Sequence, residues 1–187
     1  MELDPQSSNV NTFYAAILYF ARHYDEAIRQ SHRALELDPN SWVTYWVLNS
    51  CYDAKGMYEE GARAQQRNWE LYKDAAAAAP GLLAAQAQGG YHARMRYTLT
   101  YFLKRSQKSN NYFGEIAAQH ALLGEKDKAF YYLDRAYQEY DAWIFQLQDP
   151  MLDSLHDDPR WLAFLRRLNL QDTPLARLPA APAPAAH

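Results

Sequence analysis

Cysteine, glycine and an excess of either charge are scarce in this chain. Its 187 residues include one cysteine and seven glycines, and 22 acidic residues stand against 19 basic ones, so the net charge is −3. The single cysteine, Cys51, excludes an intramolecular disulfide framework and a multi-cysteine zinc site, and it fits a reducing compartment. The near balance of charges gives no electrostatic basis for nucleic-acid or membrane contact, so we expect neither partner for this segment.

Long apolar runs are also missing. The sequence has no stretch of about 18 apolar residues, and no apolar signal-peptide core follows the charged Glu2 and Asp4. We therefore expect a soluble, cytoplasmic segment, with a periplasmic location left open if a longer protein carries a transmembrane helix upstream. Alternating runs of valine, isoleucine and threonine are absent, while alanine, leucine, glutamine and arginine are plentiful, which predicts an all-α protein.

A step of 34 residues recurs along the chain. Leu-Asp-Pro begins at Leu3 and again at Leu37. Residues one step apart also match in class, as shown by Tyr14 and Leu48, Leu18 and Tyr52, Tyr24 and Tyr58, Ala27 and Gly61, and the series Gly56, Gly90 and Gly124. A fixed step of this length indicates a repeating structural unit. Pro39 would end the last helix of the first unit, because the residue before a proline is disfavoured in helical conformation.

Each unit has the pattern of two short amphipathic helices. In the first unit, apolar residues at spacings of three and four define one face from Tyr14 to Ala21 and another from Ala27 to Leu35. Small side chains occupy the positions where the paired helices would approach most closely, namely Ala15, Ala27, Ala34, Gly61, Ala129 and Ala136. The pattern predicts an array of helical hairpins.

These features resemble the tetratricopeptide repeat (TPR). The likeness is strong in YDEAIRQSHRALELDPN (24–40) and in WVTYWVLNSCYDAKGMYEEGARA (42–64). DPMLDSLHDDPRWLAFLRRLNL (149–170) is similar to the closing segment of TPR arrays in bacterial multidomain regulators, of the CadC winged-helix or adenylate-cyclase type. The resemblance covers about 10–170 and implies a right-handed α-solenoid of helix–turn–helix repeats with a C-terminal capping helix.

The resemblance also implies boundaries within a single array over 1–170. The expected units are 8–41, 42–75, 76–109 and 110–143, followed by a capping segment at 149–170. The third unit is degenerate, since Pro80 falls in its first helix, and we expect helices near 81–88 and 91–107. The Pro- and Ala-rich 171–187 has too little apolar bulk to fold and is expected to be a disordered tail. The opening MELDP resembles the end of a preceding unit, which suggests an excerpt from a longer protein.

Patterns that carry catalysis or cofactor binding are missing. The sequence has no phosphate-binding loop, no dinucleotide fingerprint, no nucleophile elbow and no HExxH zinc motif. His32 and Glu36 are four residues apart, but a solvated helical pair explains them better, and His120 is expected to be a packed side chain. We therefore expect no catalytic residue, no cofactor and no metal site, and a chain that is not an enzyme.

In TPR proteins the first helices of the hairpins line a concave groove that holds an extended peptide or a partner helix. The groove positions implied by the resemblance are Asn9, Thr12, Ala16, Tyr19 and Phe20 in the first unit, Val43, Trp46, Ser50, Asp53 and Ala54 in the second, and Asn111, Gly114, Ala118, Ala121 and Leu122 in the fourth. Tyr19, Phe20 and Trp46 would be rigid aromatic anchors, with core packing as the alternative role. Thr12 and Ala16 replace the lysine and asparagine of chaperone-binding TPR domains, which disfavours a co-chaperone role.

Three hypotheses for function follow. The leading one is a non-catalytic scaffold for protein–protein interaction, the C-terminal partner-binding or sensory part of a larger bacterial regulator. The second is a small-molecule-binding or enzymatic domain with a cleft at the irregular third unit, formed by Tyr91, His92, Arg94, Arg96 and Tyr97. The third is a homodimer formed through an exposed apolar end of the array.

Overall fold

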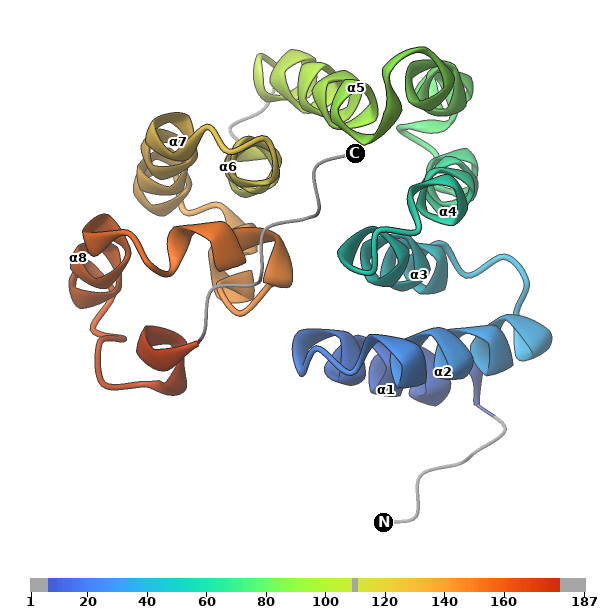
Figure 1. Ribbon diagram of the computed structural model, residues 1–187, viewed down its shortest axis with the longest axis horizontal. Helices are drawn as coiled ribbons and strands as arrows, with labels where there is room; N and C mark the ends of the chain where they lie inside the picture. The colour runs from blue at the N-terminus through green and yellow to red at the C-terminus, as the bar shows by residue number, and fades with distance from the viewer. Residues whose placement is uncertain (1–6, 109–110, 179–187) are drawn as a thin grey trace. The chain divides into compact units, whose positions relative to one another are not determined.

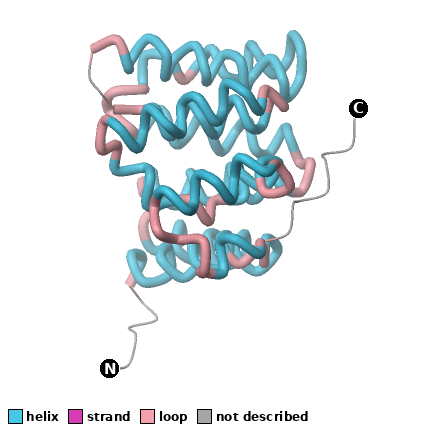
Figure 2. Tube along the Cα trace, turned by 90° about the vertical axis from the view of Figure 1, so that its left-hand side faces the viewer, coloured by secondary structure: helices cyan, strands magenta, loops and turns pink. Residues whose placement is uncertain are grey.

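The structure of this chain is a computed structural model that describes residues 7–108 and 111–178. Within these ranges the chain consists of helices and loops and has no β-strand, so the prediction of an all-α protein is confirmed for them (Figure 2). The α-helices are α1 (Ser8–Phe20), α2 (Tyr24–Leu37), α3 (Trp42–Ala54), α4 (Tyr58–Leu71), α5 (Pro80–Ser106), α6 (Phe113–Leu122), α7 (Lys126–Gln138) and α8 (Pro159–Arg167). Short 3-10 helices are η1 (Ala76–Ala78), η2 (Ala142–Gln146), η3 (Pro150–Leu155) and η4 (Pro174–Arg177).

Contacts divide the chain into two compact units, and the boundary between Arg94 and Met95 lies inside α5. The helix pairs α1/α2, α3/α4 and α6/α7 each begin and end within one of the units expected from the 34-residue step. The assignment of these pairs to TPR-type repeats, and the handedness of the array, stay predictions.

In the first unit, α1 packs on α2, α3 packs on both of them, and α4 packs on α3 (Figure 1). Serines start two of these helices, because the hydroxyls of Ser7 and Ser41 accept hydrogen bonds from backbone amides in the first helical turn. The turn after α3 uses Gly56 at φ 73°, and Arg22 adopts the same left-handed region at φ 64° after α1. The Arg22 guanidinium donates a 2.7 Å hydrogen bond to the carbonyl of Phe20, which helps to hold the turn between α1 and α2.

The third predicted hairpin is one helix interrupted by two glycines. Gly89 (φ −154°, ψ 23°) and Gly90 (φ 64°, ψ −156°) are non-helical, so α5 consists of segments on either side of them. Glycine accepts the positive φ of the second position without a steric penalty, which explains the break. The segments agree with the helices predicted near 81–88 and 91–107.

In the second unit, α6 packs against α7, η2 and η3, and η4 contacts α8. Aspartates begin η2, η3 and α8, because Asp141, Asp149 and Asp158 each accept a hydrogen bond from a backbone amide two residues later. The apolar face expected for α8 is buried at Trp161, Phe164 and Leu165, half-buried at Leu168 and exposed at Leu162.

The first part of the expected disordered tail is folded. Residues 171–178 include η4, and Leu175 and Ala176 pack against the core of the second unit. The indole of Trp161 also donates a hydrogen bond of 3.3 Å to the carbonyl of Leu175. The prediction for 171–178 was therefore wrong, because these few apolar side chains find a partner in α8. The remainder of the expected tail, 179–187, lies outside the described residues.

Candidate partner-binding face

The predicted groove positions of α1 and α3 fall into three classes of exposure. Asn9 and Ala54 are exposed; Ala16, Phe20, Val43, Trp46, Ser50 and Asp53 are half-buried; Thr12 and Tyr19 are buried. We refer to Ala16, Phe20, Val43, Trp46 and Ser50 together as the α1–α3 face. Its members combine apolar side chains with partial exposure, which is what a protein-binding surface requires.

Tyr19 and Thr12 belong to the core rather than to this face. The Tyr19 side chain is 1% exposed, and its ring meets the Trp46 ring edge-on at 5.7 Å between centroids. The Thr12 hydroxyl lies 2.7 Å from the hydroxyl of Thr44 in a buried hydrogen bond that joins α1 to α3. A partner cannot reach either side chain in this structure, so the alternative of core packing holds for Tyr19.

The aromatic part of the face is formed by Phe20 and Trp46. Their ring centroids lie 6.2 Å apart, and both rings pack on one side against the core of the first unit. Since both residues remain half-buried, the other side is open to solvent. Rings held in this way are rigid and lose little conformational entropy when a partner covers them.

A buried ion pair lies at the C-terminal end of α3. Arg94 of α5 is completely buried, and its guanidinium donates to the carboxylate of Asp53, which is itself only 13% exposed. Two glutamine side chains accept further hydrogen bonds from the guanidinium, Gln65 at 2.7 Å and Gln86 at 3.1 Å. The second carboxylate oxygen of Asp53 accepts a 2.8 Å bond from Asn49. The network therefore ties α3, α4 and both sides of the α5 break together.

Gly61 of α4 makes room for this ion pair. A Cβ atom at this position would overlap the Asp53 carboxylate and lie 3.5 Å from the Arg94 guanidinium. The 34-residue step places Gly61 where Ala27 stands in the previous hairpin, a position predicted to be small so that a neighbouring helix can approach. Here the missing side chain admits a charged group instead.

Burial changes the acid–base properties of several groups near the ion pair. It raises the pKa of the Asp53 carboxyl, while the charge of Arg94 and the hydrogen bonds from Arg94 and Asn49 act in the opposite direction. It also raises the pKa of Tyr91. Burial raises the pKa of the Cys51 thiol to about 12, so this group stays protonated and is a poor nucleophile.

Of the five residues predicted to surround a ligand cleft, three have contacts with side chains outside this set. The Tyr91 ring packs against the Tyr58 ring with 4.5 Å between centroids and a tilt of 30°, and its centroid lies 5.4 Å from Cζ of Arg94. His92 is exposed, and the exposed Arg96 pairs with Glu125 at 3.2 Å in the second unit. Because Arg94 already has Asp53 and two glutamines as partners, the cluster is explained as a structural network.

The fourth predicted hairpin has no open groove at the expected positions. Gly114, Ala118 and Ala121 of α6 are buried, and η2 and η3 pack on this helix. The Trp143 side chain lies where a Cβ of Gly114 would be, and the Ser154 hydroxyl donates a 3.0 Å bond to the carbonyl of Ala121. Asn111 is exposed and Leu122 half-buried. The chain itself therefore covers most of the face that the resemblance implied for a partner.

Two hollows with charged linings lie on the surface. Two surface hollows, of about 210 Å³ and 460 Å³, lie at the charged turns between α1 and α2 and between α6 and α7, away from the α1–α3 face. In the ranges 7–108 and 111–178, no group of three or more His, Cys, Asp or Glu side chains is placed to hold a metal ion. None of the helices described has both the length and the apolar character that a membrane span requires.

Comparison with known proteins returns no relative for this chain: no family model, no curated protein and no solved structure matches it. The TPR identification accordingly continues to depend on the residues and spacings quoted above.

Proposed function

We propose that this chain is a non-catalytic interaction domain of the TPR type that binds an extended peptide or a partner helix on the α1–α3 face. The observation that supports the proposal best is the row of half-buried side chains from Val43 through Trp46 to Ser50 on α3, beside Ala16 and Phe20 of α1. Residues 43, 46 and 50 follow the spacing of one helical face, so a single ligand would contact them in succession.

The face offers a suitable mixture of contacts. Phe20 and Trp46 supply apolar area, Ala16 leaves space between the helices, and Ser50 supplies a hydrogen-bonding group. Its anchors are held in place before a partner arrives, since both rings pack on the core cluster of the first unit. Such preorganisation lowers the entropic cost of binding.

The Asp53–Arg94 network contributes to this function by positioning. It joins the end of α3 to α4 and α5 through charged hydrogen bonds. None of these bonds involves a side chain of the α1–α3 face. We therefore assign the network to the rigidity of α3 rather than to ligand contact.

The likeness of 149–170 to the closing segment of regulator-borne TPR arrays supports a place at the C-terminus of a larger bacterial regulator. In that setting the α1–α3 face would bind the partner whose presence the regulator reports.

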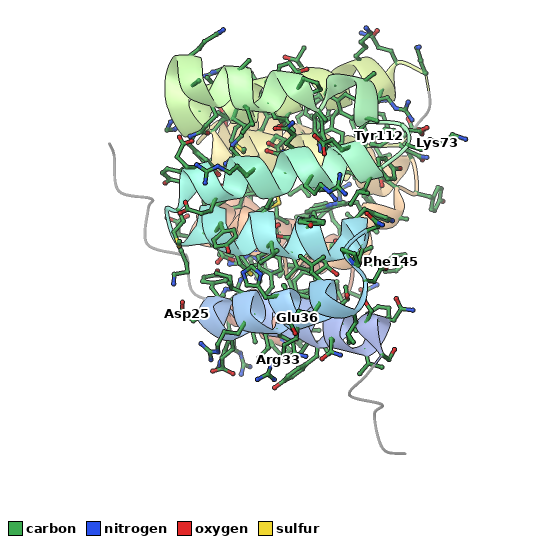
Figure 3. All side chains as sticks on the ribbon, turned by 90° about the vertical axis from the view of Figure 1, so that its right-hand side faces the viewer. Asp25, Arg33, Glu36, Lys73, Tyr112 and Phe145 are labelled. Atoms are coloured by element: carbon green, nitrogen blue, oxygen red, sulfur yellow. The ribbon has the colours of Figure 1, made fainter. Side chains whose placement is uncertain are left out.

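Selection from a displayed peptide library on the immobilised full chain tests the proposal. Peptides that enrich should lose binding at least about tenfold to Trp46→Ala and to Ser50→Arg, because one removes the main apolar anchor and the other fills the face with a charged side chain. Arg33→Ala on α2 is the matched control, since Arg33 is exposed on another helix and should leave binding unchanged (Figure 3). Enriched peptides that bind the two face variants as well as the wild type would refute the proposal.

A further inference from the structure

The α1–α3 face carries no ionisable side chain. Its five residues are apolar or neutral, and Asp53, the one charged residue of α3, is paired with Arg94 and only 13% exposed. A charged ligand would lose hydration on this face without meeting a group of opposite sign. The face therefore favours an uncharged segment.

Two hydrogen-bonding groups of the face are open to such a ligand. Neither the indole N–H of Trp46 nor the hydroxyl of Ser50 bonds to another described residue, and neither is among the buried atoms that lack a partner. The two residues are one helical turn apart on α3, about 6 Å along its axis. Donors placed in this way suit the backbone carbonyls of an extended chain, which have no hydrogen bonds within their own segment.

The rings of Phe20 and Trp46 suit proline. Their planes are inclined at 53° with 6.2 Å between centroids, so the two rings present inclined apolar surfaces rather than a flat one. Surfaces lined by aromatic rings bind polyproline II segments, and the ordering cost of such a ligand is low because proline fixes φ in advance.

The chain contains a segment of this chemistry outside the described residues. Residues 179–187 read PAAPAPAAH, in which Pro179 and Pro182 are three residues apart and only the histidine side chain can ionise. Polyproline II has three residues per turn and rises about 3.1 Å per residue, so it would place these two prolines on one edge, about 9 Å apart. Val43 and Ser50 are about 10.5 Å apart along α3. The two prolines therefore match the length of the face.

We infer that the α1–α3 face binds the chain's own segment 179–187 in polyproline II conformation, so that this segment competes with the external partner. The inference rests on the proposed function, because it names an occupant for the same face. The segment supplies carbonyls for Trp46 and Ser50 and apolar rings for Phe20, and it brings little charge to a face that has none. At an effective concentration of about 1 mM, a segment with a dissociation constant of about 0.1 mM would weaken binding of the partner about tenfold.

Amide and indole NMR spectra of the isotopically labelled full chain test the inference. Pro179→Gly together with Pro182→Gly removes the preset φ from the segment and leaves every described residue unchanged. The double variant should shift the indole N–H of Trp46 and the amides of α1 and α3. Pro5→Gly, which also lies outside the described residues, is the matched control and should leave these signals in place.

A synthetic peptide of residues 177–187 supplies the segment from outside. Added to the full chain that carries both proline substitutions, it should give saturable shifts of the same signals. Trp46→Phe keeps an aromatic ring and loses the donor, so it should weaken peptide binding a few fold, while Ser50→Arg should weaken it at least about tenfold. Tyr131→Glu, at an exposed aromatic of α7, is the control and should leave peptide binding unchanged.

Dilution of the wild-type chain shows how the segment binds. Differences from the proline variant that persist on dilution assign the contact to a single chain, and differences that fade assign it to two copies; both results support the segment as the occupant. Unchanged α1 and α3 signals in the proline variant, or peptide shifts that do not saturate at millimolar concentration, would overturn the inference.

The proposed function is tested separately from its occupant. Library peptides that bind the wild type and lose affinity for Trp46→Ala would uphold the proposed function even when 179–187 does not bind. If the segment does compete, the same library peptides should bind the double proline variant about tenfold more tightly than they bind the wild type.

Discussion

The same face of a helix is buried in α3 and in α6, but its side chains differ in kind. In α3 it carries Val47 and Cys51, both fully buried in an apolar cluster. Two 34-residue steps later, α6 carries Glu115 and Gln119, of which Glu115 is half-buried and Gln119 is buried. The 34-residue step thus predicts which face of a helix is turned toward the protein interior more reliably than it predicts whether the side chains on that face are apolar or polar.

The polar pair of α6 also differs from the polar network of the first unit. Among the described residues, Oε2 of Glu115 and Oε1 of Gln119 are buried without a hydrogen-bond partner, whereas Arg94 and Asp53 have several. Burial, with the nearby charge of Asp141 as a lesser cause, raises the pKa of Glu115 to about 7. This fold therefore accepts buried polar groups in two ways: with partners, as in the charged network of Arg94, or without them, as in Glu115, whose carboxyl binds its proton more tightly than a free glutamate does.

Arg94→Ala should give the largest loss of stability. It leaves the Asp53 carboxylate enclosed without its cation, which costs about 3–5 kcal/mol of the free energy of unfolding. Urea unfolding of the full chain near neutral pH measures this. The double variant Asp53→Leu, Arg94→Met should recover most of the loss, because it removes both charges and keeps similar volume. A loss under about 1 kcal/mol for Arg94→Ala would show that the ion pair is not buried as described.

Glu115→Gln should increase the free energy of unfolding, and the size of this gain should depend on pH. Because the pKa of Glu115 is about 7 in the folded chain against 4.5 for a free glutamate, the folded state holds its proton more tightly, and stability is lost as pH rises from 4.5 through 7. Above this window the variant should be more stable than the wild type by about 2–3 kcal/mol, and below it the difference should vanish.

The control for that comparison is Glu36→Gln, which makes the same change of charge at an exposed position of α2 (Figure 3). Unfolding by urea at several pH values gives both curves. An equal gain for Glu115→Gln at all pH values, or a gain matched by Glu36→Gln, would contradict the assignment of the effect to burial of Glu115.

Gln119→Leu should give the smallest change in the free energy of unfolding of these three variants. It replaces a buried amide whose Oε1 lacks a partner by an apolar side chain of similar size, as α3 has at the corresponding Cys51. We expect a gain of about 1 kcal/mol that does not depend on pH, measured in the same urea series. Destabilisation instead would mean that the amide contributes a contact that the apolar side chain cannot replace.

Local patterns in the sequence were sufficient for much of the fold. The apolar periodicity predicted the helices, and the helices expected near 81–88 and 91–107 lie on either side of the break in α5. Each of these depends on interactions within a few residues. The candidate site was predicted less well, because exposure depends on which distant segments cover a helix.

Particular residues show why the remainder could not be predicted. Tyr19 was predicted on the groove side of α1, and its burial depends on residues of other helices, such as Trp46 of α3 and Tyr24 of α2. The partners of Arg94 come from three other places in the chain, and no spacing links Asp53, Gln65 and Gln86 to it. The covering of Gly114 by Trp143 required knowing where η2 runs, since a small residue indicates close approach but not the identity of the neighbour.

The buried cysteine of α3 gives the chain a natural probe of its own breathing motions. Cys51 is the single thiol in the sequence and is enclosed between α1, α2 and α3, so a thiol reagent reaches it only when these helices separate. Under native conditions the labelling rate would count those openings in the same way that amide hydrogen exchange does. Every variant of the first unit can thus be ranked by the frequency of its local openings, without adding a label site to the molecule.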